Sequence, residues 1–142
     1  MSEPFRVRYP LRFAHCDPAG IAYYPRLLEL CDGAIEDWTK AVLGVSRRTL
    51  HLEMKLALPT VDLRASFAAP ARLGDLLDIE ITVVRLGRSS IVLDAAVTTD
   101  GQDRFAITYT QVLTAMDGMK AEQWPPEWRE RLTMQMEKET QA

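Results

Sequence analysis

The chain has 142 residues, a length that fits one ordinary domain, and no polar or low-complexity stretch divides it into two. Apolar residues make up 47% of it and charged residues 26%, a composition typical of a folded globular protein. With 17 basic and 20 acidic residues the formal net charge is −3, which argues against a nucleic-acid-binding module. We therefore expect a single domain over residues 1–142 that does not bind nucleic acid.

The cysteines, Cys16 and Cys31, and the histidines, His15 and His51, match no zinc-site spacing. We expect free thiols in a reducing cytoplasm, with no metal and no other cofactor. The first residues lack the apolar run of a signal peptide, and no stretch approaches the roughly 18 consecutive apolar residues of a spanning helix. The sequence thus predicts a cytoplasmic protein that is not inserted in a membrane.

Apolar and polar side chains alternate over residues 5–13, which predicts a strand with one buried face. Pro10 lacks an N–H donor and favours an edge position or a bulge there. The alternation stops at residues 14–20, which are predicted to form a loop. Beyond the loop, apolar residues recur at steps of three and four. That period predicts one long helix over residues 25–43, which Gly44 ends.

Residues 46–56 fit either a short helix or a loop. Four more alternating segments follow, at residues 61–67, 77–83, 91–97 and 105–109, and an amphipathic helix is predicted at residues 125–139. The short links between consecutive strands favour antiparallel pairing. Strands of about ten residues reach roughly 33 Å, farther than the helix, so the sheet should curl around it. The predicted architecture is α+β: a hot-dog fold with one long helix, a curved five-stranded antiparallel sheet and a C-terminal helix.

The loop before the long helix carries a specific run of residues, FAHCDPAGIAYYP, at positions 13–25. Its Cys-Asp-Pro-Ala-Gly-Ile at residues 16–21, followed by Tyr24 and Pro25, resembles the signature of the 4-hydroxybenzoyl-CoA thioesterase family of hot-dog proteins. Weaker similarity extends over roughly the whole chain. This resemblance implies an acyl-CoA thioesterase with the fold predicted above.

The resemblance implies that Asp17 is the nucleophile or general base, and that the backbone N–H of Tyr24 polarises the thioester carbonyl. Asp17 lies just ahead of a helix start, where free N–H groups and the helix dipole favour a carboxylate. Thioester hydrolysis needs such a nucleophile or base, with donors for the developing oxyanion. The alternative is that Asp17 only caps a turn before Pro18, which is the more frequent role of an isolated Asp-Pro pair.

Asp32, two helical turns beyond Tyr24, matches the family position that accepts a hydrogen bond from the ring hydroxyl of 4-hydroxybenzoyl. An exposed acid on the polar helix face is an equally open alternative. The family's tryptophan after the helix is not matched, since the chain reads Gly-Val-Ser-Arg-Arg at residues 44–48. The resemblance therefore indicates the reaction more firmly than the acyl group.

The turn between the third and fourth strands contains backbone, hydroxyl and guanidinium donors that could bind a phosphate, from Gly87, Arg88, Ser89 and Ser90. The family has a more basic cluster at this turn for the CoA nucleotide, and only Arg88 clearly matches it. An ordinary hairpin is the alternative. Further cations that could contact CoA are Arg47, Arg48 and Arg104.

Other chemistry has weaker support in the sequence. Other hot-dog thioesterases place a catalytic Glu or Asp on the central helix, so the resemblance makes Glu29 and Glu36 secondary candidates, although a solvated helix face explains them more simply. Catalysis by Cys16 is improbable because adjacent His15 should point the opposite way, and Cys31 lies on the apolar stripe. The tryptophans are interpreted as packing residues, namely Trp38, Trp124 and Trp128.

We expect an enzyme that hydrolyses a CoA thioester, aromatic and 4-hydroxybenzoyl-CoA-like, to the free acid and CoA. The alternative is a non-hydrolytic protein that binds acyl-CoA or acyl-carrier protein in the same pocket. Because a small subunit of this fold leaves a sheet edge uncovered, we expect a homodimer with interface sites, or a dimer of dimers, a homotetramer. The subunit that supplies Arg88 to a given site stays open.

Overall fold

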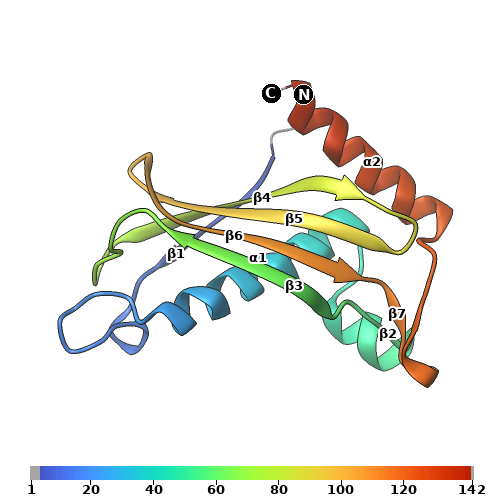
Figure 1. Cartoon of the computed structure of the whole chain (residues 1–142), viewed down its shortest axis with the longest axis horizontal. Coiled ribbons are helices and arrows are strands. Elements are labelled where there is room, and N and C mark those ends of the chain that lie inside the picture. Colours follow the sequence, from blue (N-terminus) through green and yellow to red (C-terminus); the bar gives the residue numbers. More distant parts are fainter. Residues whose placement is uncertain (1–3, 142) are drawn as a thin grey trace.

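A five-stranded antiparallel sheet curves around a single long helix in the computed structural model, which describes residues 4–141 (Figure 1). The helix is α1 (Tyr24–Leu43) and the strand order is β1-β4-β5-β6-β3. The strands are β1 (Phe5–Pro10), β3 (Thr60–Phe67), β4 (Leu76–Leu86), β5 (Ser90–Thr99) and β6 (Gln102–Val112). The predicted hot-dog architecture is confirmed.

Short elements and a second helix complete the chain. A small sheet is formed by β2 (Leu56–Ala57), β7 (Thr114–Ala115) and β8 (Lys120–Ala121). Single helical turns are η1 (Phe13–His15), η2 (Thr49–Glu53) and η3 (Asp117–Met119), and the C-terminal helix is α2 (Pro126–Gln141). The undecided residues 46–56 thus contain the π-helical turn η2 and the strand β2. Among the described residues, no helix is long and apolar enough to cross a bilayer.

The core lies between α1 and the sheet, as the two sequence periods require. Buried positions alternate along β4, β5 and β6, and the buried stripe of α1 includes Cys31, Ile35 and Trp38. Burial of each large apolar side chain, such as that of Ile35, contributes about 1.5–3 kcal/mol to the stability of the fold. Trp124 and Trp128 also belong to this core, so the tryptophans pack as predicted.

The first strand is shorter than predicted, because it ends at Pro10 rather than at Phe13. Leu11 donates its N–H to the carbonyl of Asp75 and accepts the N–H of Gly74, which takes the chain out of the β1–β4 ladder. The side chain of Phe13 is consequently 78% exposed instead of buried. Pro10 does lie in an edge strand, as predicted.

The strands β3 and β4 follow each other in sequence but do not pair, which differs from the predicted pairing of consecutive strands. β3 pairs with β6 at the far edge of the sheet, opposite β1. The connecting residues 68–75 instead bond to the loop before α1: Ala22 donates to the carbonyl of Ala71, and Leu73 donates to that of Gly20. This connection therefore supports the loop that carries the predicted catalytic residues.

Candidate functional site

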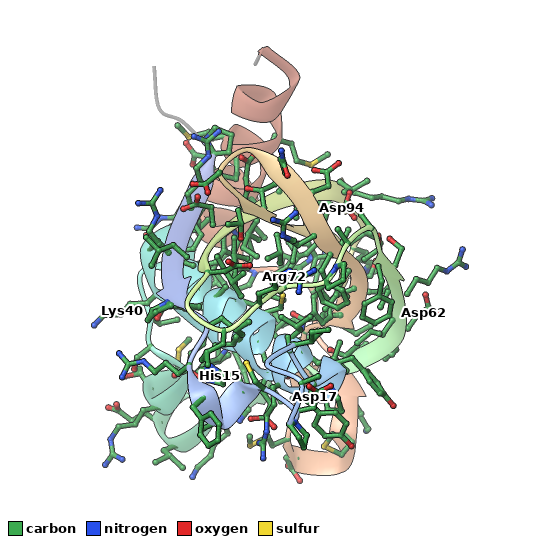
Figure 2. All side chains as sticks on the ribbon, turned by 90° about the vertical axis from the view of Figure 1, so that its left-hand side faces the viewer. His15, Asp17, Lys40, Asp62, Arg72 and Asp94 are labelled. Atoms are coloured by element: carbon green, nitrogen blue, oxygen red, sulfur yellow. The ribbon has the colours of Figure 1, made fainter. Side chains whose placement is uncertain are left out.

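The loop before α1 folds back on itself at one end of the molecule, the end that faces the viewer in Figure 2. Cys16 and Ala22 form an antiparallel bridge, and Tyr23 donates its N–H to the carbonyl of His15 at 2.8 Å. At the tip, Asp17 donates its N–H to the carbonyl of Ile21 at 2.9 Å. The hairpin thus fixes Asp17 a few residues before the start of α1.

The carboxylate of Asp17 uses only one of its two oxygens within the loop. Oδ1 accepts the backbone N–H of Ala19 at 2.9 Å and that of Ile21 at 3.3 Å. Oδ2 has no hydrogen-bond partner among the described residues. Asp17 therefore does cap the turn, as the alternative interpretation expected, but this role leaves one carboxylate oxygen available for chemistry.

The backbone N–H of Tyr24 is a free donor at the start of α1. As the first residue of the helix, Tyr24 has no helical carbonyl four residues earlier to bond. Pro25 has no N–H, and the N–H of Arg26 is bonded to the carbonyl of Tyr23. Of the first three helical residues, Tyr24 therefore offers the N–H that an oxyanion could accept.

An apolar pocket of about 340 Å³ lies beside this donor, between the start of α1 and the end of β3. The ring of Tyr24 contacts that of Phe67 edge to face, with the ring centres 6.2 Å apart. We call this cavity the apolar pocket; its lining residues are Ile21, Ala22, Tyr24, Leu27 and residues 67–71. Its size and lining suit an aromatic group.

A second cavity of about 250 Å³ lies farther along α1, next to the start of β3. We call it the polar pocket; its lining residues are Asp32, Ile35, Glu36, Arg47, Leu58, Thr60 and Gln111. The two pockets lie along the same side of α1, since each is lined by α1 and by one end of β3. Asp32 follows Tyr24 by eight residues, about 12 Å of helix.

Burial and charge act on the ionisable groups of the polar pocket. Although more than a third of the residue is exposed, desolvation raises the pKa of Asp32, opposed by Tyr109 and Arg47. Desolvation lowers the pKa of Arg47, opposed by Glu36 and Asp32. The Nε of Arg47 donates to the hydroxyl of Thr39 at 3.3 Å. The pocket therefore contains one guanidinium between two carboxylates.

Gln111 is the polar group that sequence analysis missed. Its side chain is only 5% exposed, and its Nε2 donates to the hydroxyl of Thr60 at 3.1 Å. Its Oε1 is buried without a hydrogen-bond partner, as is the hydroxyl of Tyr109, which lies near Asp32 without a well-formed bond to it. The signal was available: the inward alternation of Phe105, Ile107 and Tyr109 continues to residue 111, where a glutamine stands at a core position.

The turn at residues 87–90 is a tight hairpin at the opposite end of the sheet from Asp17 (Figure 1). Gly87 donates its N–H to the carbonyl of Ser90, and a Cβ on Gly87 would collide with the Ser90 side chain. Arg129 of α2 donates to the carbonyl of Gly87 at 2.6 Å, and the side chain of Arg88 is exposed. The eleven residues of β4 separate this turn from the Asp17 loop by roughly 33 Å.

A family model described as the thioesterase superfamily matches residues 19–106. The chain belongs to the thioesterase superfamily. A 1,4-dihydroxy-2-naphthoyl-CoA hydrolase from Thermosynechococcus vestitus is 36% identical over 101 residues, which cover 71% of this thioesterase and 68% of that protein. A 4-hydroxybenzoyl-CoA thioesterase from Pseudomonas sp. strain CBS-3 is 31% identical over 106 residues, 72% and 75% of the two chains. The predicted resemblance is confirmed at the level of the family.

The fold comparison agrees. The crystal structure of a thioesterase superfamily protein from Jannaschia sp. CCS1 superposes with a TM-score of 0.87 at 26% identity, and it covers 96% of this thioesterase and 95% of that chain. The long helix, the five-stranded sheet and the C-terminal helix described above are therefore those of a hot-dog thioesterase.

The remaining residues that the sequence offered for catalysis or CoA contact do not line either pocket. The Cys16 thiol donates to the carbonyl of Arg12, while His15 Nδ1 accepts the N–H of Arg12, so the two side chains do not pair. Burial raises the pKa of the Cys31 thiol to about 12, in keeping with a core position. The other three are Glu29, in an ion pair with Arg26, exposed Arg48, and Arg104, 4.0 Å from Asp75.

Proposed function

We propose that this thioesterase hydrolyses the CoA thioester of a hydroxylated aromatic acid to the free acid and CoA, with Asp17 as nucleophile or general base. The two relatives named above carry names of CoA thioester hydrolases, which supports acyl-CoA thioesterase activity. Both names also specify a hydroxylated aromatic acyl group, naphthoyl in one and benzoyl in the other. The proposal extends that substrate class to this chain.

One observation carries the proposal: only one oxygen of the Asp17 carboxylate is hydrogen-bonded, and the backbone N–H of Tyr24 is unbonded. Two backbone donors hold Oδ1, which fixes the carboxylate, while Oδ2 is free. The N–H of Tyr24 is available for an oxyanion, and the apolar pocket next to it can receive a ring. A carboxylate, an oxyanion donor and an acyl pocket are the parts that thioester hydrolysis requires.

Two routes use these groups, and both conserve atoms and charge. In the first, Oδ2 attacks the carbonyl carbon and CoA leaves as the thiolate, which forms an acyl-aspartyl anhydride that water then hydrolyses. In the second, Asp17 takes a proton from the water that attacks the carbonyl, and that proton passes to the departing thiolate. A mass spectrum of a reaction quenched within one turnover separates the routes, because only the first adds the acyl mass to the peptide that contains Asp17.

Substitution of Asp17 tests the proposal directly. We expect Asp17→Asn to lower thiol release from 4-hydroxybenzoyl-CoA by at least about a thousandfold, since asparagine is neither nucleophile nor base at this position. Asp117→Asn, at an exposed aspartate of η3, is the matched control and should turn over like the wild type. Wild-type turnover in Asp17→Asn would refute the assignment. Binding of the ester by wild type without any release of CoA would favour a non-hydrolytic binding protein instead.

The distance between the Asp17 loop and the turn at residues 87–90 supports a shared site. All eight residues of β3 are exposed, and β3 is an edge strand. We infer that a second copy pairs antiparallel along this edge, to give a homodimer with a continuous sheet. The two-fold axis reverses the strand direction, so the partner's turn at residues 87–90 then lies at the same end of the assembly as Asp17. In this arrangement the CoA nucleotide would be held by the other copy, with Arg88 as its principal cation.

A further inference from the structure

The Asp17 loop is attached to the rest of the fold through the connection at residues 68–75. Ile21 of the loop and Arg72 of the connection form an antiparallel bridge. Among the described residues, the other backbone hydrogen bonds of residues 13–23 stay within the loop and the first turn of α1, apart from two that flank this bridge. These two bonds, each 2.9 Å long, run from the N–H of Ala22 to the carbonyl of Ala71 and from the N–H of Leu73 to the carbonyl of Gly20. The loop therefore takes its position from the connection.

Asp75 closes the turn that ends this connection. Its Oδ2 accepts the N–H of Arg72 at 2.8 Å, and its own N–H donates to the carbonyl of Arg72 at 2.9 Å. Its carbonyl accepts the N–H of Leu11 at 2.8 Å, where the chain leaves β1. Gly74, inside the turn, has a φ of +92°, a left-handed conformation that suits glycine. Because Arg72 stands between the two residues that bond to the loop, the Asp75 carboxylate fixes the segment with which the loop pairs.

Arg104 of β6 contacts both ends of the connection. Its carbonyl accepts the N–H groups of Ala68 and Ala69, at 3.0 and 3.3 Å. Its Nε lies 4.0 Å from Asp75 Oδ2, and the two side chains are only 19% and 23% exposed. This Nε is buried and has no hydrogen-bond partner among the described residues. Opposite charges that are largely withdrawn from water attract each other more strongly than an exposed pair, and removal of either one leaves the other partly buried without compensation.

We propose that Asp75 is a positioning residue for the Asp17 loop, and that Arg104 keeps the Asp75 carboxylate in its place. The inference rests on the proposed catalytic role of Asp17 and adds the residues that align it. Neither Asp75 nor Arg104 lines the apolar pocket, so both act through the backbone of the connection. A shift of about 1 Å at a catalytic group can reduce turnover about a hundredfold. Loss of this support should therefore lower kcat, while KM changes little because the CoA nucleotide is proposed to bind at the distant turn of residues 87–90.

The test begins with Asp75→Ala, which removes the acceptor of the Arg72 N–H and the charge that faces Arg104. We expect kcat for 4-hydroxybenzoyl-CoA to fall by at least about tenfold, with KM within about twofold of the wild type. Asp75→Asn keeps an oxygen for the Arg72 N–H and should restore kcat to within about threefold of the wild type. Asp78→Ala is the matched control, since it removes a carboxylate of β4 that bonds to Arg8 at 2.7 Å, and it should leave kcat and KM unchanged.

Amide hydrogen exchange measures the attachment of the loop independently of turnover. In Asp75→Ala the N–H groups of Ala22 and Leu73 should exchange at least about tenfold faster than in the wild type, because their bonds join the loop to the connection. Amides in the middle of β5 should keep their wild-type rates, which separates this local effect from a general loss of stability. If Asp75→Ala does not fold, Arg104→Met should change kcat and exchange in the same direction.

The outcomes separate this inference from the proposed function. An unchanged kcat in Asp75→Ala, a loss that appears in KM instead of kcat, or an Asp75→Asn variant as impaired as Asp75→Ala would overturn the inference while thioester hydrolysis stands. Exchange that accelerates as much in β5 as at Ala22 would overturn it as well. If the wild type hydrolyses no ester, the proposed function fails, and exchange alone tests the support of the loop. Faster exchange at Ala22 and Leu73 in Asp75→Ala would then support that role of Asp75, and wild-type exchange would reject it.

Discussion

The two edges of the sheet differ in how their side chains are bonded, and the two sides of α1 differ in the same way. At the β1 edge, Arg8 pairs with Asp78, and the hydroxyl of Tyr9 donates to Asp37 of α1 at 2.6 Å. At the β3 edge all eight residues of the strand are exposed, and Asp32 of α1 faces a cavity. The polar side chains Arg8 and Tyr9 at the β1 edge thus have hydrogen-bond partners, whereas Gln111 Oε1 near the β3 edge has none among the described residues.

This asymmetry supports the proposal that the substrate and the second copy bind toward the β3 edge. The orphaned Gln111 oxygen, the apolar pocket and the bare strand all lie toward the β3 edge. Unpaired strands and unsatisfied buried groups are costs that a fold keeps where a ligand or a partner compensates them. At the β1 edge a cavity of about 350 Å³ is lined by charged side chains that pair with one another, Arg6 with Glu80 and Arg8 with Asp78.

Among the variants that test the contrast between the two edges, the largest effect is expected at the exposed strand β3. Leu63 lies in the middle of β3 and is 43% exposed. The variant Leu63→Lys places a charge on the edge along which the second copy should pair. We expect Leu63→Lys to convert the dimer to monomer in sedimentation velocity, and to lower thiol release by at least about tenfold because the partner's turn is removed. Sedimentation also distinguishes a dimer from a dimer of dimers.

A matched change elsewhere controls for the added charge. Val84→Lys alters a valine of β4 that is 50% exposed, and it should leave both the mass in solution and the turnover unchanged. If Leu63→Lys stays dimeric, the second copy does not pair along β3. If it becomes monomeric yet turns over like the wild type, each chain holds a complete site and Arg88 is not supplied by a partner.

A smaller effect is expected at the closed edge. Tyr9→Phe removes the hydrogen bond to Asp37, and we expect it to lower the free energy of unfolding by about 1 kcal/mol at pH 7 in urea titrations. Burial and the bond to Asp37 raise the pKa of Tyr9 above its usual value near 10. A raised pKa means that this stabilisation is complete below about pH 10 and is lost as the pH rises further, so the deficit of Tyr9→Phe should narrow in alkali.

Tyr23→Phe provides the comparison, since the Tyr23 hydroxyl has no hydrogen bond among the described residues. It should unfold at the same urea concentration as the wild type. Equal stabilities of Tyr9→Phe and Tyr23→Phe would mean that the contact between β1 and α1 contributes nothing, and that the contrast between the two edges is geometric only.

Local patterns in the sequence were sufficient for the elements and for the antiparallel pairing of β4 with β5 and of β5 with β6, but not for the pairing of the edge strands. The alternation along β4, β5 and β6 and the three-and-four spacing along α1 are short-range signals, and each predicted its element within a few residues. The early end of β1 depends on bonds between Leu11 and residues 74–75. The pairing of β3 with β6 likewise joins distant segments, which no local period encodes.

The same distinction applies to the site. Asp17 and Tyr24 lie seven positions apart, in the loop and at the first residue of α1, so a single motif pointed to both. The polar pocket combines Asp32, Arg47, Thr60 and Gln111, which only the folded chain brings together. The sequence did suggest Asp32, and it suggested Arg47 as a cation for CoA, whereas the structure places Arg47 beside Glu36 and Asp32 instead. Gln111 was overlooked because a polar residue inside an apolar alternation was not treated as a signal.

The smallest expected effect compares Asp32 and Asp37, two carboxylates of the same helix that face opposite edges. Desolvation raises the pKa of Asp32, and an acid with a raised pKa stabilises the fold below its unfolded value near 3.8 and loses that contribution as the pH rises. We therefore expect Asp32→Asn to be more stable than the wild type at pH 7, by a few tenths of a kcal/mol because Asp32 is partly exposed, and equal to it near pH 3. Asp37→Asn should be less stable at pH 7, since it weakens the acceptor of Tyr9. Urea titrations at pH 7 and pH 3 measure these differences in the free energy of unfolding. If both variants are stabilised, or both destabilised, at pH 7, the two carboxylates do not differ as the contrast between the edges implies.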